Sequence, residues 1–143
     1  MGTTDRKFRL ANGRFFQERR GAVTVEFAIT APIFFLFLLL AFEFGWLNVI
    51  RHTADNAAYE AARTAMVPGA TAADARAEVN RILSIVGARG AVVTVTPANL
   101  DVDTESVTVE VDVPMNQNGL ILPRFTSGTT LHSESTLRTE RAE

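Results

Sequence analysis

Residues 27–42 have the sequence FAITAPIFFLFLLLAF, in which Thr30 carries the only polar side chain. The apolar pattern extends over the whole of 22–50. A helix needs roughly 20 such residues to cross about 30 Å of hydrocarbon. We therefore predict a membrane-spanning helix over residues 23–50. Pro32 removes one backbone hydrogen bond inside it, which a membrane helix tolerates when neighbouring groups satisfy the freed carbonyl.

The charge of the chain is divided unevenly around that segment. Residues 1–21 carry six basic and two acidic side chains, whereas residues 51–143 carry eight basic and twelve acidic ones. Because basic residues stay on the cytoplasmic side of a span, we predict a cytoplasmic amino terminus and an extracytoplasmic carboxyl-terminal part in the inner (cytoplasmic) membrane. The basic residues could instead form an arm that binds nucleic acid or anionic lipid. Topology is the simpler account beside an apolar run, and we expect no nucleic-acid partner.

Residues 1–21 show no sustained periodicity, and we predict a mobile, basic leader that is removed. The apolar segment after it differs from an ordinary secretory signal. It is longer than the usual apolar region of about 7–15 residues, no A-x-A pattern closes it, and its periodicity continues beyond the span. The span should therefore be retained in the mature chain.

Small residues follow the span at helical spacing, with polar residues between them. They lie at i, i+3, i+4 and i+7 on one helical face, and they are Ala54, Ala57, Ala58, Ala61, Ala62 and Ala65. Such a face lets another helix approach closely, so we predict a helix-packing face here. Val67-Pro68-Gly69 ends the helix, which gives one long helix over residues 22–67.

Residues 68–143 are predicted to form a head domain outside the membrane. Thr71 can cap a second helix, with Asp74 in the first turn. Alternating apolar and polar residues predict strands over 91–96 and 106–113, and a weaker alternation predicts an edge strand over 129–140. The predicted fold class is α+β, a long amino-terminal helix followed by one helix on a three-stranded antiparallel sheet. The chain has no cysteine, so the head must depend on packing or on assembly with partners.

The junction between leader and span has the sequence Arg19-Arg20-Gly21-Ala22-Val23-Thr24-Val25-Glu26-Phe27-Ala28. It resembles the processing site of type IV pilin-like proteins and is most similar to the TadE-like family of tight-adherence pilus pseudopilins. The resemblance covers residues 19–67 and includes Pro32, Glu43-Phe44-Gly45 and residues 56–63. Phe27 departs from the family pattern, in which tyrosine often follows the glutamate.

The resemblance implies cleavage by a prepilin peptidase between Gly21 and Ala22, which makes Glu26 the fifth mature residue. It implies a minor pilin or pseudopilin of the Flp type that acts in assembly of a tight-adherence pilus or a related secretion filament. The implied partners are other pilin-like subunits, contacted through the amino-terminal helix, the peptidase, and the pilus assembly platform in the inner membrane. The alternative is an uncleaved, single-pass anchored binding module with an extracytoplasmic head.

The chemistry of the junction fits processing and an uncleaved anchor equally, and the resemblance is what favours processing. A carboxylate within an apolar helix is costly. Cleavage after Gly21 would create an α-amino group close to Glu26, and two unit charges 4 Å apart attract by about 4 kcal/mol at an effective dielectric of 20. Cleavage would also remove the basic residues that hold the helix at the inner leaflet. Without cleavage, Glu26 would lie at the headgroup level of a signal anchor.

Glu43 has two interpretations. It marks the outer membrane interface, with Trp46 as an interfacial aromatic residue, or it pairs with a basic group of a neighbouring subunit. We favour the interface.

No motif in the sequence indicates enzymatic chemistry. His52 and His132 have no second ligand at metal-site spacing. Asp101, Asp103 and Glu105 alternate as calcium ligands do, but the rest of an EF-hand loop is missing. We therefore predict no catalytic residue, no cofactor and no metal site.

Overall fold

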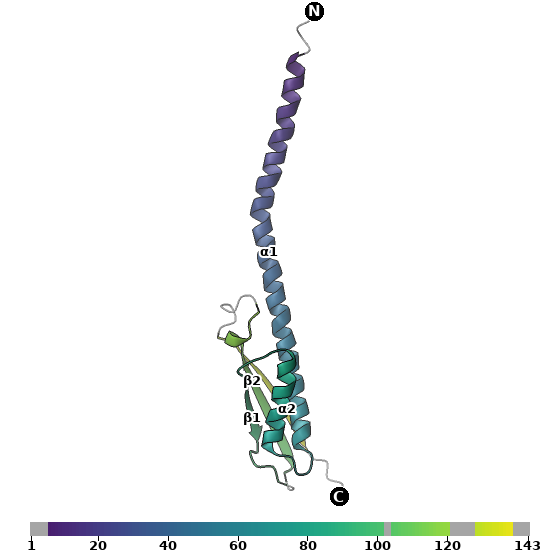
Figure 1. The fold of residues 1–143 in the computed structure, drawn as a ribbon, viewed down its shortest axis with the longest axis vertical. Coiled ribbons are helices and arrows are strands. Elements are labelled where there is room, and N and C mark those ends of the chain that lie inside the picture. The colour runs from purple at the N-terminus through teal and green to yellow at the C-terminus, as the bar shows by residue number, and fades with distance from the viewer. Residues whose placement is uncertain (1–5, 102–103, 121–127, 139–143) are drawn as a thin grey trace, which may run out of the picture. The chain divides into compact units, whose positions relative to one another are not determined.

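The computed structural model describes residues 6–101, 104–120 and 128–138, and it describes side chains from Gly21 onward (Figure 1). Its elements are the helices α1 (Arg6–Ala65) and α2 (Ala72–Ile85), the strands β1 (Val92–Thr96), β2 (Ser106–Pro114) and β3 (Thr130–Arg138), and the short 3-10 helix η1 (Met115–Gln117). This arrangement confirms the predicted α+β class. The chain divides into two compact units, residues 1–41 and residues 42–143.

Helix α1 begins at Arg6, well before the predicted start after Gly21. The predicted start of the long helix at residue 22 is therefore wrong, because residues 6–20 of the predicted leader are helical as well, and residues 1–5 lie outside the described part. The removal of the leader stays a prediction. Apolar periodicity reports a buried face, and a helix without such a face need not show it. These residues contain no proline and are mostly good helix formers, so the backbone continues as a helix. At its other end α1 stops at Ala65, close to the predicted Val67-Pro68-Gly69 stop.

Both ends of α2 are held by local hydrogen bonds. At its start Asp74 N donates to Thr71 Oγ1 (3.3 Å) and Thr71 N donates to Asp74 Oδ2 (2.8 Å), which makes a capping box. At its end Ala88 N donates to Leu83 O (3.1 Å) and Gly87, at φ 66°, donates from its N–H to Ser84 O. This is a Schellman ending, which requires the left-handed conformation that glycine adopts without strain. The predicted cap of this helix is confirmed.

The sheet is antiparallel, with strand order β1-β2-β3. Val109 in β2 lies opposite Val95 in β1 and Ser135 in β3. The three predicted strands are confirmed to within a few residues, and β3 is at the edge of the sheet as predicted. Residues 139–140 of the predicted third strand lie outside the described residues.

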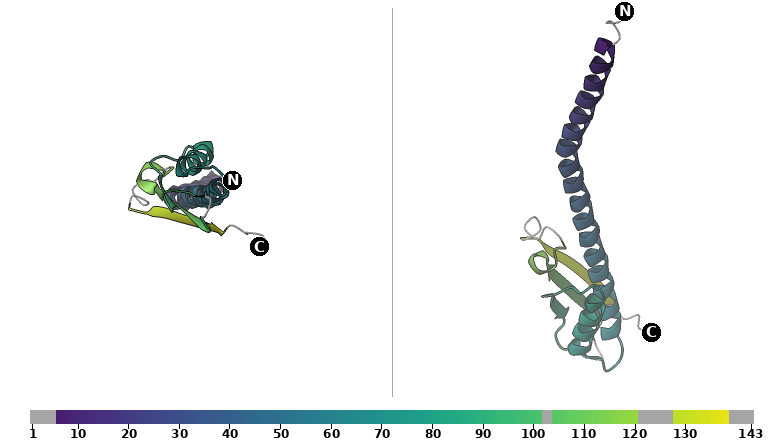
Figure 2. Two further views of the ribbon diagram at one scale, coloured as in Figure 1. Left: turned by 90° about the horizontal axis from the view of Figure 1, so that it is seen from below. Right: turned by 45° about the horizontal axis from the view of Figure 1, so that its top comes forward.

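One hydrophobic core joins the carboxyl-terminal part of α1, the inner face of α2 and the sheet. In β2 the alternate residues Val107, Val109, Val111 and Val113 are all buried. Figure 2 shows α2 and the sheet beside the carboxyl-terminal part of α1. The small side chains of α1 bring these elements close together, and the large side chains of the core come mainly from α2 and β2.

Candidate functional site

The predicted processing junction lies within α1 and is open to solvent. Gly21, Ala22 and Glu26 are all exposed. A Cβ atom added to Gly21 would meet no atom within 4 Å. The Gly21–Ala22 peptide therefore lies in continuous helix, at the residue type that lowers local helix stability by roughly 1 kcal/mol relative to alanine.

The segment after this junction exposes large apolar side chains along its whole length. Phe27 is 69% exposed and Phe37 is 66% exposed. Thr30, the one polar residue of this run, donates from its Oγ1 to Glu26 O at 2.9 Å, so its hydroxyl is satisfied inside the helix. Pro32 lies inside α1, and the helix continues past it. Soluble surfaces rarely carry a contiguous apolar area of this size, so it marks a surface that lipid or protein covers.

Within the described residues, one helical stretch, residues 21–65, meets the length and composition required to cross a membrane. The most apolar part of that stretch is entirely outside the core of the structure. A core helix of a soluble protein would instead be mostly buried. The exposure and the apolar composition together indicate membrane anchoring.

Glu43 has a partner inside its own chain. Its side chain is 3% exposed, and its Oε1 accepts a hydrogen bond from Leu120 N at 3.2 Å. The indole Nε1 of Trp46, one turn later, donates to Asn118 O at 2.8 Å. Both Glu43 and Trp46 therefore contact the segment that follows β2. The position of Glu43 at the outer membrane interface stays a prediction, as does a bond to a basic group of a neighbouring subunit. Gly45, between them, is exposed.

The role of Asn118 in connecting the elements of the head was not predicted from the sequence. Its side chain is buried and makes three hydrogen bonds, from Arg89 N to Oδ1 (2.7 Å), from Nδ2 to Arg89 O (2.8 Å) and from Nδ2 to Pro114 O (2.7 Å). Together with the bond from Trp46, these contacts connect α1, the segment before β1 and the end of β2. The one signal was its position in the Asn118-Gly119 dipeptide, which indicates a turn but no partner.

The predicted helix-packing face is occupied by the chain itself. All six alanines lie in the core: Ala54, Ala57, Ala58, Ala61 and Ala62 are 0% exposed, and Ala65 is 6% exposed. The small side chains of this face therefore do allow close packing, but the elements that pack against them belong to the head of the same chain. Beside this face, Ser133 of β3 donates from Oγ to Asp55 Oδ1 at 2.7 Å, which ties the edge strand to α1.

The remaining candidate residues do not form a chemical site. His52 is exposed. His132 Nδ1 lies 2.8 Å from Asp112 Oδ1 on the outer face of the sheet, and this hydrogen bond raises the pKa of His132 above its ordinary 6.5. Among the described residues no group of three or more His, Cys, Asp or Glu side chains could hold a metal ion. Asp103, one of the three alternating acids, lies outside those residues.

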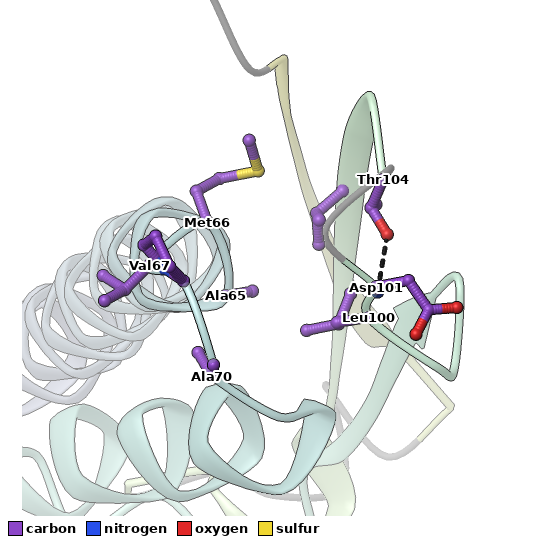
Figure 3. A pocket seen from close by; sticks show the side chains of 10 residues that line it. Ala65, Met66, Val67, Ala70, Leu100, Asp101 and Thr104 are labelled. Carbon is purple, nitrogen blue, oxygen red and sulfur yellow. Dashed lines mark hydrogen bonds between the residues drawn. The ribbon is translucent and has the colours of Figure 1, made fainter.

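A cavity of about 230 Å³ opens at the α1–α2 turn (Figure 3). Met66, Val67 and Leu100 contribute apolar side chains to it. Among the described residues that line it, Asp101 is the one with a titratable side chain, and its backbone N–H donates to Thr104 Oγ1 at 2.9 Å.

Comparison with known proteins finds a family model that matches the exposed segment. Residues 21–63 match the family model described as TadE-like protein. The chain carries a TadE-like segment. The predicted resemblance is thereby confirmed from Gly21 of the junction through the apolar run and most of the alanine face, and not for residues 19–20 or 64–67. No curated protein and no solved structure matches the chain.

A TadE-like segment indicates a pilin-like component of a Tad pilus. The TadE-like family is a structural pilus component and is not known as an enzyme family. The family match ends at residue 63, so α2 and the sheet lie outside it.

Proposed function

We propose that this chain is a membrane-anchored, pilin-like structural subunit that a prepilin peptidase cleaves between Gly21 and Ala22. It acts in assembly of a tight-adherence pilus or a related secretion filament. The observation that supports this most is the exposed apolar stretch of α1, which lies inside the TadE-like match and follows the glycine of the junction.

The exposed segment also indicates which part of α1 neighbouring subunits would contact. Because the alanine face is filled by the chain's own head, neighbouring pilin-like subunits would contact residues 22–42 and not the face of Ala54–Ala65. In a filament the apolar side chains would pack against the same segments of neighbours, and in the membrane they would face lipid. After cleavage the Ala22 ammonium lies one helical turn from Glu26 and can pair with that carboxylate or a neighbour's.

The charge distribution supports the orientation. The leader carries a net charge of +4 and the part after residue 50 carries −4. We infer that the amino terminus is cytoplasmic and that residues 68–143 are extracytoplasmic, with the precursor held in the inner membrane until it is processed. The peptidase and the assembly platform would meet the chain at that membrane.

Mass spectrometry of the protein from membranes of the producing cell tests processing directly. We expect a mature chain that begins at Ala22. Gly21→Ala should still be cleaved, and Gly21→Leu should accumulate as the longer precursor because a peptidase pocket that accepts glycine should reject bulk. Since Gly21 has no atom near its Cβ position, neither variant should disturb the fold, and the difference would belong to the peptidase.

A chain that keeps Met1 would favour the second candidate, an anchored extracytoplasmic binding module that is never processed. The continuity of α1 through Gly21–Ala22 is the observation that favours it. Cleavage of Gly21→Leu at the same peptide would contradict the assigned junction.

A further inference from the structure

The segment after β2 is fixed against α1 at the end of the apolar run. Leu120 N donates to Glu43 Oε1, and Trp46 Nε1 donates to Asn118 O. These two bonds attach residues 118–120 to one turn of α1 that begins directly after Phe42. The position of this segment along α1 is therefore set by hydrogen bonds of the structure.

Apolar side chains are exposed at this same place. Phe42 is 57% exposed, Phe44 is 67% exposed and Leu120 is 53% exposed. The Leu120 side chain stays open to the surroundings, because the contact with Glu43 uses the backbone N–H. Arg89, which is exposed, is held to Asn118 through its backbone and so lies at the same end of the head.

The extent of the lipid-facing helix follows from burial. Glu43 is 3% exposed and Ile50 is 0% exposed, so the head already covers one face of α1 within the predicted span of 23–50. Residues 23–42 are about 20 residues, which is enough to cross the hydrocarbon core. Phe42 would then lie at the outer boundary, and Glu43 only about 1.5 Å further along the helix.

This inference rests on the proposed function. We propose that the end of the head that carries Leu120 lies on the extracytoplasmic face of the inner membrane, with the Leu120 side chain in the lipid interface. A bilayer fits this surface because it offers an apolar interior to Leu120, Phe42 and Phe44 and phosphate groups to Arg89. The bond from Leu120 N also screens the Glu43 carboxylate where it would otherwise meet lipid. The head is thus placed on the membrane before any filament forms.

The opposite end of the head supplies a matched control. Val67 is 58% exposed, close to the value for Leu120, but it lies beyond the carboxyl end of α1. The distance along the axis of α1 from Glu43 to Ala65 is about 33 Å. Figure 1 shows the α1–α2 turn and the η1 segment at opposite ends of the head.

The test uses the full chain, which has no cysteine of its own. Leu120→Cys, Val67→Cys and Phe35→Cys are each labelled with an environment-sensitive fluorophore and reconstituted in vesicles of phosphatidylethanolamine and phosphatidylglycerol. Lipids with a quencher near the headgroup or deep in the acyl chain then report depth. We expect loss of fluorescence from the deep quencher for position 35, from the shallow quencher for position 120, and from neither for position 67.

The outcomes separate the two proposals. If position 35 is quenched and position 120 behaves like position 67, the membrane span stands and the surface contact is wrong. If position 120 is shielded from water but not quenched by either lipid, a second protein chain covers it and the surface contact is again wrong. If position 35 is not quenched, the proposed membrane anchoring fails as well. Emission of Trp46, the single tryptophan, verifies that each variant keeps the contact with Asn118.

Discussion

Replacing Asn118 with alanine should destabilise the head without touching the apolar core. The side chain is 6% exposed and makes three hydrogen bonds with two backbone partners, Arg89 and Pro114. Alanine removes all three and leaves two carbonyl groups and one N–H without their protein partner. The backbone oxygen of Asn118 also accepts a hydrogen bond from the indole Nε1 of Trp46. Loosening this turn should therefore weaken the contact with α1.

The expected loss follows from the number of bonds and their surroundings. A net contribution of about 1 kcal/mol for each hydrogen bond gives about 3 kcal/mol for the three. Arg89 is exposed and water can replace part of its bonding, so we expect a loss of about 2 to 3 kcal/mol in the free energy of unfolding. Asn118→Asp keeps the shape of the side chain but turns the donor Nδ2 into an acceptor that faces two carbonyl oxygens. It should be at least as destabilising as alanine.

Urea unfolding of the full chain in detergent, followed by Trp46 emission, measures this loss, because the single indole reports on the contact with Asn118. Asn80→Ala, at an exposed asparagine of α2, is the control and should change the free energy of unfolding by less than about 0.5 kcal/mol. If Asn118→Ala unfolds like the control, or if Asn118→Asp is as stable as the original chain, the hydrogen-bonding argument is wrong.

Two further predictions concern charged side chains. The raised pKa of His132 means that its bond to Asp112 stabilises the folded state fully below the ordinary value of 6.5 and that this contribution is lost as the pH rises through the raised pKa. The difference in unfolding midpoint between the original chain and His132→Gln should therefore shrink with rising pH, and a growing difference would refute it. Glu26→Leu should leave the chain in the membrane fraction but reduce filament yield, because it removes the partner of the Ala22 ammonium; with Phe27→Leu as control, an unchanged yield would count against that pair.

Local patterns of residues were sufficient to predict most of the secondary structure. The four alternating valines of β2 predicted a strand with one buried face, and all four are buried. Thr71 and Asp74 predicted the start of α2, where both take part in the cap. Such patterns work because the period of side chains along a strand or a helix is fixed by the backbone alone. The helix over residues 6–20 was not predicted because these residues show no apolar period, although they contain no proline and are mostly good helix formers.

Composition and periodicity depend on neighbouring residues, and they were sufficient to predict an apolar helical stretch after Gly21 and an α+β head. What covers the alanine face and what Glu43 binds depend on contacts between distant parts of the chain, which only the folded molecule shows. A stripe of small residues accepts any close-packed neighbour, and here that neighbour is the chain's own head. One partner of Glu43, Leu120, lies 77 residues away and offers a backbone N–H that every residue except proline has, so no residue type in the sequence could point to it.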